Sequence, residues 1–318
     1  MLAEQAVGLT IPFAMKALVT GGAGFIGSHL VDLLLEKSCD VVVIDNLSSG
    51  KRSQIPDSIV FFEGDAGNSD LLAQALPGCD VVFHLAAVSS VQDSLDRPIE
   101  VHNTNLTATL ALLEASVRHK VPRFVFSSSA AVYGDTGGEP AREDMTPKPM
   151  SHYAVQKLAS EYYCEVYHRL HGLETVCLRY FNVYGPRQRA DSPYSGVIAK
   201  FIDAARAGQP ITIFGDGEQT RDFCHVKDVA LANFAAAECR ASAVSGLAFN
   251  IGTGRSLAVL ELASAIGTIF PATPEACQVP GRRGEIKHSR ADIKQAHTLL
   301  SWQPTIRLKD GLEQLAKK

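Results

Sequence analysis

The segment Lys16-Ala-Leu-Val-Thr-Gly21-Gly-Ala-Gly24-Phe-Ile-Gly27 carries the strongest structural signal in this chain. A strand-like run leads into three glycines spaced as GxxGxxG, and a helical pattern follows them. Glycine permits a tight turn and lets the backbone approach a pyrophosphate, which then rests on the helix N-terminus. Because the glycines lie between a strand and a helix, the segment predicts a dinucleotide-binding unit.

Strand-like and helical patterns alternate around this segment through the first half of the chain. Such alternation is typical of a parallel sheet that helices cover on both faces. The expected strands are residues 16–20, 41–45, 59–63, 81–85, 124–128 and 175–180, and the expected helices are 26–37, 71–76, 101–119 and 152–171. The predicted fold class is α/β, with a doubly wound parallel-sheet Rossmann domain and a smaller α/β substrate-binding domain.

The composition changes after Gly185-Pro186, where the alternation loosens and Gly, Pro and Arg become more frequent. We expect the Rossmann domain to span residues 15–185 and a mainly substrate-binding domain to span residues 186–318. A strand at residues 247–251 is expected to return to the main sheet, so the boundary is not a single cut. Residues 1–14 precede the fold pattern and are expected to form a disordered extension.

Bulk properties exclude several classes of function. The 318 residues carry a formal net charge of −4 and no basic run, so nucleic acid and anionic membranes are not expected partners. The seven cysteines are scattered without CxxC spacing, which predicts neither a zinc site nor a disulfide framework. No apolar stretch is long enough for a bilayer, and residues 1–14 lack the basic residues of a signal peptide. A cytoplasmic location without a metal site is expected.

The second expected strand ends at Asp45, about 20 residues after the last glycine, where an acid can accept from the adenosine ribose hydroxyl. A carboxylate there repels a 2′-phosphate, which favours NAD over NADP, although Lys51 and Arg52 follow in the loop. Asp65 follows the third strand and is a candidate for the adenine amino group.

Tyr153 and Lys157 are four residues apart in an expected helix, so their side chains lie on one face. A free phenol has a pKa of about 10, and a neighbouring cation lowers it. The pair is therefore a candidate general base for an alcohol.

The motifs TGGAGFIGSH, DNLSSG, HLAA, FSSSAAVYG, YxxxK and RYFNVYGPRQ occur in this order from Met15 onward. With them the chain resembles the extended short-chain dehydrogenase/reductases, and within these the NAD-dependent 4-epimerases of UDP-sugars such as UDP-glucose and UDP-N-acetylglucosamine. The resemblance implies that Tyr153 is the base, that Lys157 lowers its pKa and bonds the nicotinamide ribose, and that Ser129 bonds the sugar's 4-hydroxyl.

The same resemblance implies two sets of binding residues. The residues expected at NAD are Gly21, Gly24, Phe25, Ile26, Gly27, Asp45, Asn46, Ser48, Gly50, Asp65, Leu85, Ala86, Ala87, Asn105, Ser127, Tyr153, Lys157 and Tyr180. The residues expected at the UDP-sugar are Ser90, Ser94, Ser129, Asn182, Val197, Arg221, Arg282 and Ser289. Arg221 and Arg282 would bind the pyrophosphate, because a guanidinium is always charged and offers forked donors.

Two positions bear on the reaction and the sugar. Related dehydratases carry an Asp-Glu pair after the catalytic Ser or Thr, whereas this chain has Ala130-Ala131, whose methyl groups cannot move a proton. This favours epimerisation at C4 over dehydration. Ser289 falls where some relatives carry a Tyr, so an N-acetyl group would fit, although small-residue relatives that act on plain hexoses also exist. Ser89 stands where bacterial galactose enzymes place a Lys.

Two alternatives remain at this stage. A UDP-glucuronate 4-epimerase would need a cation for the C6 carboxylate, with Arg187 or Lys148 as candidates. A non-catalytic NAD-binding sensor would have no use for Ser129, Tyr153 and Lys157 together. The resemblance also implies a homodimer through a four-helix seam formed by the two long helices. Their apolar residues include Leu106, Leu110, Leu113, Tyr162, Val166 and Leu170.

Overall fold

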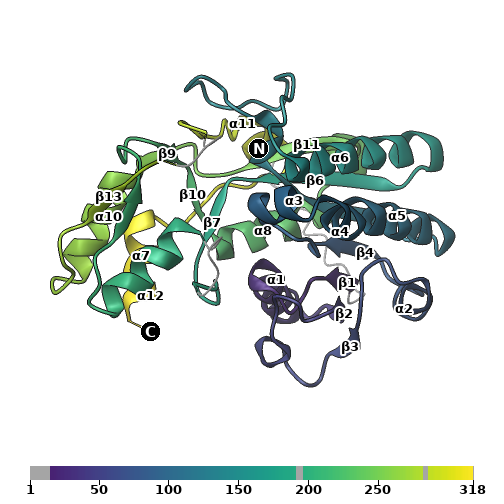
Figure 1. The fold of residues 1–318 in the computed structure, drawn as a ribbon. Helices are drawn as coiled ribbons and strands as arrows, with labels where there is room; N and C mark the ends of the chain where they lie inside the picture. The colour runs from purple at the N-terminus through teal and green to yellow at the C-terminus, as the bar shows by residue number, and fades with distance from the viewer. Residues whose placement is uncertain (1–14, 191–195, 282–285, 318) are drawn as a thin grey trace, which may run out of the picture.

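The structure, a computed structural model, describes residues 15–190, 196–281 and 286–317. A large lobe is built on a seven-stranded sheet of order β3-β2-β1-β4-β5-β6-β11, with a smaller lobe beside it (Figure 1). Every neighbouring pair in this sheet is parallel. The strands are β1 (Lys16–Thr20), β2 (Asp40–Asp45), β3 (Val60–Glu63), β4 (Val81–His84), β5 (Arg123–Ser129), β6 (Glu174–Tyr180) and β11 (Leu247–Ile251). This is the doubly wound Rossmann order, and the predicted fold class is confirmed.

Helices cover both faces of the sheet, because successive strand side chains point to opposite sides. Ala17 and Val19 of β1 join one core cluster, whereas Leu18 joins another. The first cluster includes α1 (Phe25–Glu36), α8 (Val226–Glu238) and α11 (Lys294–Leu299). The second includes α2 (Ser69–Ala75), α5 (Ala108–Arg118) and α6 (His152–His171). The chain beyond residue 186 thus returns β11 and several helices, α8 and α11 among them, to the large lobe.

The expected helix 101–119 differs in detail from the structure. It is divided into the end of α4 (Pro98–His102), a π-helical turn (Asn103–Thr107) and α5. A π-turn adds one residue to the helical turn and is often found at functional sites. Here it carries Asn105, whose buried side chain reaches a neighbouring loop.

The smaller lobe has its own apolar core, which includes Phe201, Ile213, Phe223, Leu262 and Leu312. Its helices are α7 (Val197–Arg206), α10 (Val259–Ile269) and α12 (Leu308–Ala316). Its strand pairs are β7 (Asn182–Tyr184) with β10 (Phe223–His225), β8 (Thr212–Phe214) with β13 (Cys277–Val279), and β9 (Thr220–Arg221) with β12 (Leu257–Ala258). Two further short helices are α3 (Val91–Asp96), which is labelled in Figure 1, and α9 (Ala241–Val244). Within the described ranges, no helix combines the length and the apolar character needed to cross a membrane.

Candidate active site

The glycine loop between β1 and α1 is in backbone contact with two other loops. Gly21 has a φ of +72°, and a Cβ there would lie 2.7 Å from the backbone nitrogen of Ala86, just after β4. A Cβ on Gly50 would meet the carbonyl of Ala23 at 2.5 Å, and one on Gly27 would collide with the carbonyl of Gly21. These loops meet where β1, β2 and β4 end, next to the start of α1. Ligands of open α/β sheets bind at this edge, so the cradle fits a dinucleotide pyrophosphate.

Asp45 ends β2 and is buried. Its Oδ2 accepts from the backbone N–H of Ala23 at 2.9 Å, and its Oδ1 accepts from Leu47 at 2.8 Å. Burial raises the pKa of this carboxyl, while the two hydrogen bonds oppose the rise. Each oxygen keeps a second lone pair, so Asp45 fits the expected role of accepting from a ribose hydroxyl.

The expected catalytic residues gather at the carboxyl end of β5. Ser129 is the last residue of β5, and Tyr153 and Lys157 lie in the first turns of α6. The Tyr153 phenol is buried, and the Ser129 hydroxyl is near enough to lower its pKa. The ammonium of Lys157 donates to the carbonyl of Ser127 at 2.7 Å and lies 5.9 Å from the centre of the Tyr153 ring. The structure therefore brings together the base, its cation and a hydroxyl.

Without its cofactor, the protein holds the pKa of Tyr153 above its ordinary value, and the lowering of this pKa by Lys157 stays a prediction for the NAD-bound enzyme. Burial raises the pKa of the phenol, and the Ser129 hydroxyl only partly opposes this. Burial also lowers the pKa of Lys157 to about 8. Because the Lys157 ammonium donates to the Ser127 carbonyl, it stabilises the Tyr153 phenolate less than a direct hydrogen bond to the phenol would.

Three predicted contact residues use their side chains within the protein. Ser94 is fully buried, and its hydroxyl donates to the Val91 carbonyl at 2.6 Å and accepts from the Tyr153 N–H at 3.1 Å. Ser90 caps α3 by accepting from Asp93. Ser127 donates its hydroxyl proton to the carbonyl at the end of β4. Ser94 thus fixes the start of the catalytic helix, and the sugar contacts of Ser90 and Ser94 stay predictions.

Asn105 ties the loop after β4 to α6. Its amide oxygen accepts from the Val88 N–H at 2.8 Å, and its nitrogen donates to the Val88 carbonyl and to Gln156, each at 3.0 Å. Gln156 was not foreseen from the sequence. Its position directly before Lys157 gives no signal, since its partner lies 51 residues away.

Other predicted contacts come from the end of β6 and from the smaller lobe. The Tyr180 hydroxyl donates to Asn233 at 2.8 Å, Asn182 is exposed on β7, and Val197 begins α7. Arg221 on β9 donates to the carbonyls of Thr220 and Lys287 at 2.9 and 3.2 Å. Arg282 lies outside the described residues.

Ser289 belongs to a stretch that we call the Ser289 segment, residues 286–292. Its backbone N–H donates to the carbonyl of Thr220 at 3.1 Å. The Ser289 segment therefore lies against β9, the strand that carries Arg221.

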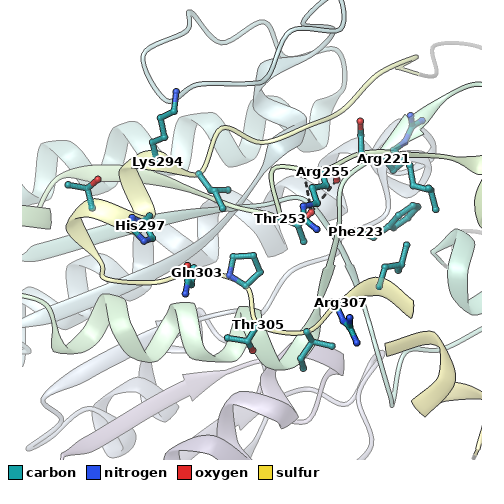
Figure 2. A pocket seen from close by; sticks show the side chains of 16 residues that line it. Arg221, Phe223, Thr253, Arg255, Lys294, His297, Gln303, Thr305 and Arg307 are labelled. Atoms are coloured by element: carbon teal, nitrogen blue, oxygen red, sulfur yellow. Dashed lines mark hydrogen bonds between the residues drawn. The ribbon is translucent and has the colours of Figure 1, made fainter. Parts of the chain in front are cut away.

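A cavity of about 830 Å³ lies behind β9 and β12, and Figure 2 shows the side chains that line it. Among the predicted site residues that the structure describes, Arg221 alone lines this cavity. Two of its cations already have acidic neighbours, with Lys294 3.4 Å from Asp292 and Arg307 2.7 Å from Asp310. Since Ser129, Tyr153 and Lys157 are absent from its lining, this cavity is not the catalytic centre.

The fold and the residues at its carboxyl edge define a Rossmann enzyme that works with a dinucleotide. The chain belongs to the NAD dependent epimerase/dehydratase family, whose model matches residues 17–252. NAD is accordingly its cofactor, and the glycine cradle and Asp45 are the residues that fit it.

Similar proteins span nearly the whole chain. A UDP-glucose 4-epimerase of Mycolicibacterium smegmatis is 40% identical over 307 residues, which cover 94% of this chain and 96% of that protein. A solved UDP-N-acetylglucosamine 4-epimerase from Methanobrevibacter ruminantium, in complex with UDP-N-acetylmuramic acid, has a TM-score of 0.91 at 38% identity, covering 96% and 97% of the two chains. A UDP-glucose 4-epimerase from Thermotoga maritima, solved with UDP-glucose, has a TM-score of 0.91 at 39% identity and covers 95% and 98%.

Proposed function

We propose that this enzyme epimerises C4 of a UDP-hexose reversibly, through a transient 4-keto sugar and with tightly held NAD. The observation that carries the proposal is the cluster of Ser129, Tyr153 and Lys157 at the end of β5, next to the loops that fit the dinucleotide. The epimerases among the similar proteins support the same reaction.

In the proposed reaction, Tyr153 removes the proton of the 4-hydroxyl while Ser129 holds that hydroxyl by a hydrogen bond. NAD, when bound, supplies the acceptor and later the donor of the C4 hydride, together with a positive charge that favours the phenolate. The 4-keto sugar turns about its link to the pyrophosphate, and Tyr153 returns the proton after the hydride reaches the other face. Lys157 holds the nicotinamide ribose and keeps its positive charge near the phenol.

The residues after Ser129 support epimerisation over dehydration. Ala130 and Ala131 begin a short 3₁₀ helix, and the N–H of Ala131 donates to the Ser129 hydroxyl oxygen at 3.2 Å. Neither side chain can exchange a proton with the sugar, so Ala130 and Ala131 add no acid or base beside Ser129. A dehydratase would need an additional acid and base near C5 and C6.

We further propose that the sugar is UDP-N-acetylglucosamine, UDP-glucose or both, with Ser289 leaving room for the acetamido group. UDP-glucuronate is the less favoured alternative, because Arg187 already pairs with Asp32 on α1 at 2.8 Å. Lys148 is exposed beside Tyr133 and is the remaining candidate cation for a C6 carboxylate.

The purified enzyme should be incubated with UDP-glucose, UDP-N-acetylglucosamine and UDP-glucuronate without added cofactor, and the C4 epimers resolved. We expect turnover of one or both of the first two sugars. Tyr153→Phe should lose roughly a thousandfold in kcat, within the usual range for a lost general base, while retaining its NAD. The proposal would be contradicted if none of the three sugars turned over even with added NAD.

We also propose a homodimer through an apolar face of α6, which packs beside α5 (Figure 1). Val155, Tyr162, Val166 and Leu170 recur on one side of α6 and are exposed, Leu170 by 73%. Leu113, expected from the sequence to contribute to such a seam, is instead fully buried in the core of its own chain.

Light scattering after gel filtration should give the mass of a dimer for the wild type and of a monomer for Leu170→Glu. The matched control is Leu260→Glu, which changes an exposed leucine of α10 in the smaller lobe and should stay dimeric. A monomeric wild type would contradict the seam.

A further inference from the structure

A chain of buried polar side chains runs from the catalytic helix to the Ser289 segment. Glu161 of α6 accepts from the guanidinium of Arg179 on β6, with a shortest distance of 2.7 Å. Arg179 also donates to the hydroxyl of Tyr133 at 2.8 Å. Tyr133 donates in turn to the amide oxygen of Asn250 at 2.7 Å. The four side chains come from four different elements and are all buried.

The direction of every bond in this chain is fixed by Arg179. A guanidinium can only donate, so the Tyr133 oxygen must accept from it and the phenolic proton must go to Asn250. That proton holds the amide oxygen of Asn250 toward Tyr133 and turns its nitrogen the other way. Burial opposes the charge on Arg179, but the bonds and attraction to Glu161 raise its pKa, so it stays a donor throughout the physiological range. A fully satisfied buried network of this kind favours one arrangement of its elements.

The far end of the chain holds the Ser289 segment. The nitrogen of Asn250 donates to the carbonyls of Ala141 and Asp292 at 2.9 and 3.1 Å. These two residues are themselves joined, because the N–H of Asp292 donates to the carbonyl of Ala141 at 2.8 Å. Asn250 thus clamps the C-terminal end of the Ser289 segment to β11, while Thr220 holds Ser289 from the other side.

The near end of the chain lies at the catalytic residues. Glu161 is one helical turn after Lys157, and it accepts a hydrogen bond from Ser128. Ser128 lies between Ser127, whose carbonyl holds Lys157, and Ser129, whose hydroxyl lies near Tyr153. Tyr133 and Asn250 therefore connect the Ser289 segment to the strand end that carries the catalytic residues.

We propose that Tyr133 and Asn250 are positioning residues that hold the Ser289 segment at a set distance from Tyr153 and thereby tune which hexose turns over. The inference rests on the proposed epimerase function. A hexose that must turn between Tyr153 and the Ser289 segment is sensitive to the position of that segment, since displacements near 1 Å at such sites lower rates considerably. The uridine and phosphates should not sense the change, because the network contacts only the end of the segment beyond Ser289.

The test compares Tyr133→Phe with Tyr167→Phe. Both remove one hydroxyl from a largely buried tyrosine, but Tyr167 bonds Glu114 at 2.9 Å, outside the network. For Tyr133→Phe we expect the ratio of kcat/KM for UDP-N-acetylglucosamine to that for UDP-glucose to rise roughly fivefold. Of the two hydrogen bonds that the variant loses, only the one to Asn250 leads to the Ser289 segment, and the loss of one such bond is worth about that factor. Affinity for UDP and NAD content should stay within twofold of wild type, and Tyr167→Phe should leave the ratio unchanged.

An unchanged ratio in an active Tyr133→Phe enzyme would overturn the positioning role, as would a loss of UDP affinity as large as the change in the ratio. If Tyr133→Phe does not fold, Asn250→Ser carries the same test, since serine keeps one donor but cannot reach both carbonyls. The outcomes are distinguishable from those of the proposed function, because inactivity of the wild type toward every UDP-sugar would overturn the reaction itself.

Discussion

The glycine loop and the Ser289 segment are held in place by different means. Around the glycine loop, backbone packs directly on backbone, and side chains are absent at Gly21, Gly27 and Gly50 where a Cβ would collide with a neighbour. Around the Ser289 segment, buried side chains hold the backbone. Asp222 accepts from Thr253 and Gly254 and, at 3.1 Å, from Ala291 within the segment. Asn250 holds the next residue of the same segment.

This difference predicts which kind of substitution disrupts each region. The cofactor loop should fail when atoms are added, because it has no space for them. The Ser289 segment should be disrupted when a buried acceptor or donor is removed, because the partner groups are left without hydrogen bonds in a place that water does not reach. The shape of the glycine loop is therefore set by its backbone, whereas single side-chain substitutions can change the position of the Ser289 segment.

The largest effect is expected from Gly27→Ala. The added methyl collides with the Gly21 carbonyl, so the loop must open and the cradle for the pyrophosphate is lost. The purified variant should contain less than roughly a hundredth of the NAD of wild type, measured by absorbance after denaturation, since a pyrophosphate site depends on that backbone geometry.

Gly267→Ala is the matched control. A Cβ at this position in α10 meets nothing within 4 Å, and alanine favours a helix over glycine by about 1 kcal/mol. It should keep its NAD and unfold at the same or a higher urea concentration. Retention of NAD by Gly27→Ala would contradict the claim that the glycine loop has no space for added atoms.

Asp222→Ala is expected to change NAD content less than Gly27→Ala does, but to lower the stability of the fold strongly. The substitution leaves the N–H groups of Thr253, Gly254 and Ala291 without their acceptor, which should lower the free energy of unfolding by roughly 3 kcal/mol or more. UDP affinity should fall, because Asp222 directly follows Arg221, the expected pyrophosphate ligand on β9, while NAD content should stay near wild type. Urea unfolding and calorimetric titration with UDP measure the two effects.

Asp310→Ala removes a half-exposed carboxylate paired with Arg307 and serves as the control for Asp222→Ala. Such surface pairs contribute little to stability, so this variant should resemble wild type. If Asp222→Ala lost NAD as readily as it lost UDP, the two regions would not be held independently.

The same contrast explains what the sequence could predict. The strands, the glycine loop and Asp45 were predictable, because each signal lies within one continuous stretch. Glu161 and Arg179 were not, although Glu161 stands one turn after Lys157, since their ion pair joins a helix to a later strand. Asp222 likewise looks like an ordinary charge beside Arg221 until the chain brings residues 253, 254 and 291 around it. The altered pKa of Tyr153 was missed because burial has no local sequence pattern.

An effect on stability that develops only above pH 8 is expected at Lys157, whose ammonium is buried beside Tyr153. Burial lowers its pKa to about 8, against about 10.4 when it is exposed. The unfolded chain therefore binds more protons than the folded one between these values, and stability should rise with pH through this window. Below pH 8 the cost is present in full. At about 1.4 kcal/mol per unit of pKa, wild type should gain roughly 3 kcal/mol relative to Lys157→Met between pH 8 and 10.5.

Urea unfolding of both proteins at several pH values, after removal of NAD, measures this difference. Lys157→Met should be the more stable protein at pH 7 and should lack the activity. This result would mean that the buried cation is needed for the reaction but lowers the stability of the folded protein. Parallel stability curves for the two proteins would contradict the lowered pKa. Such curves would mean that burial does not disfavour the charged form of Lys157.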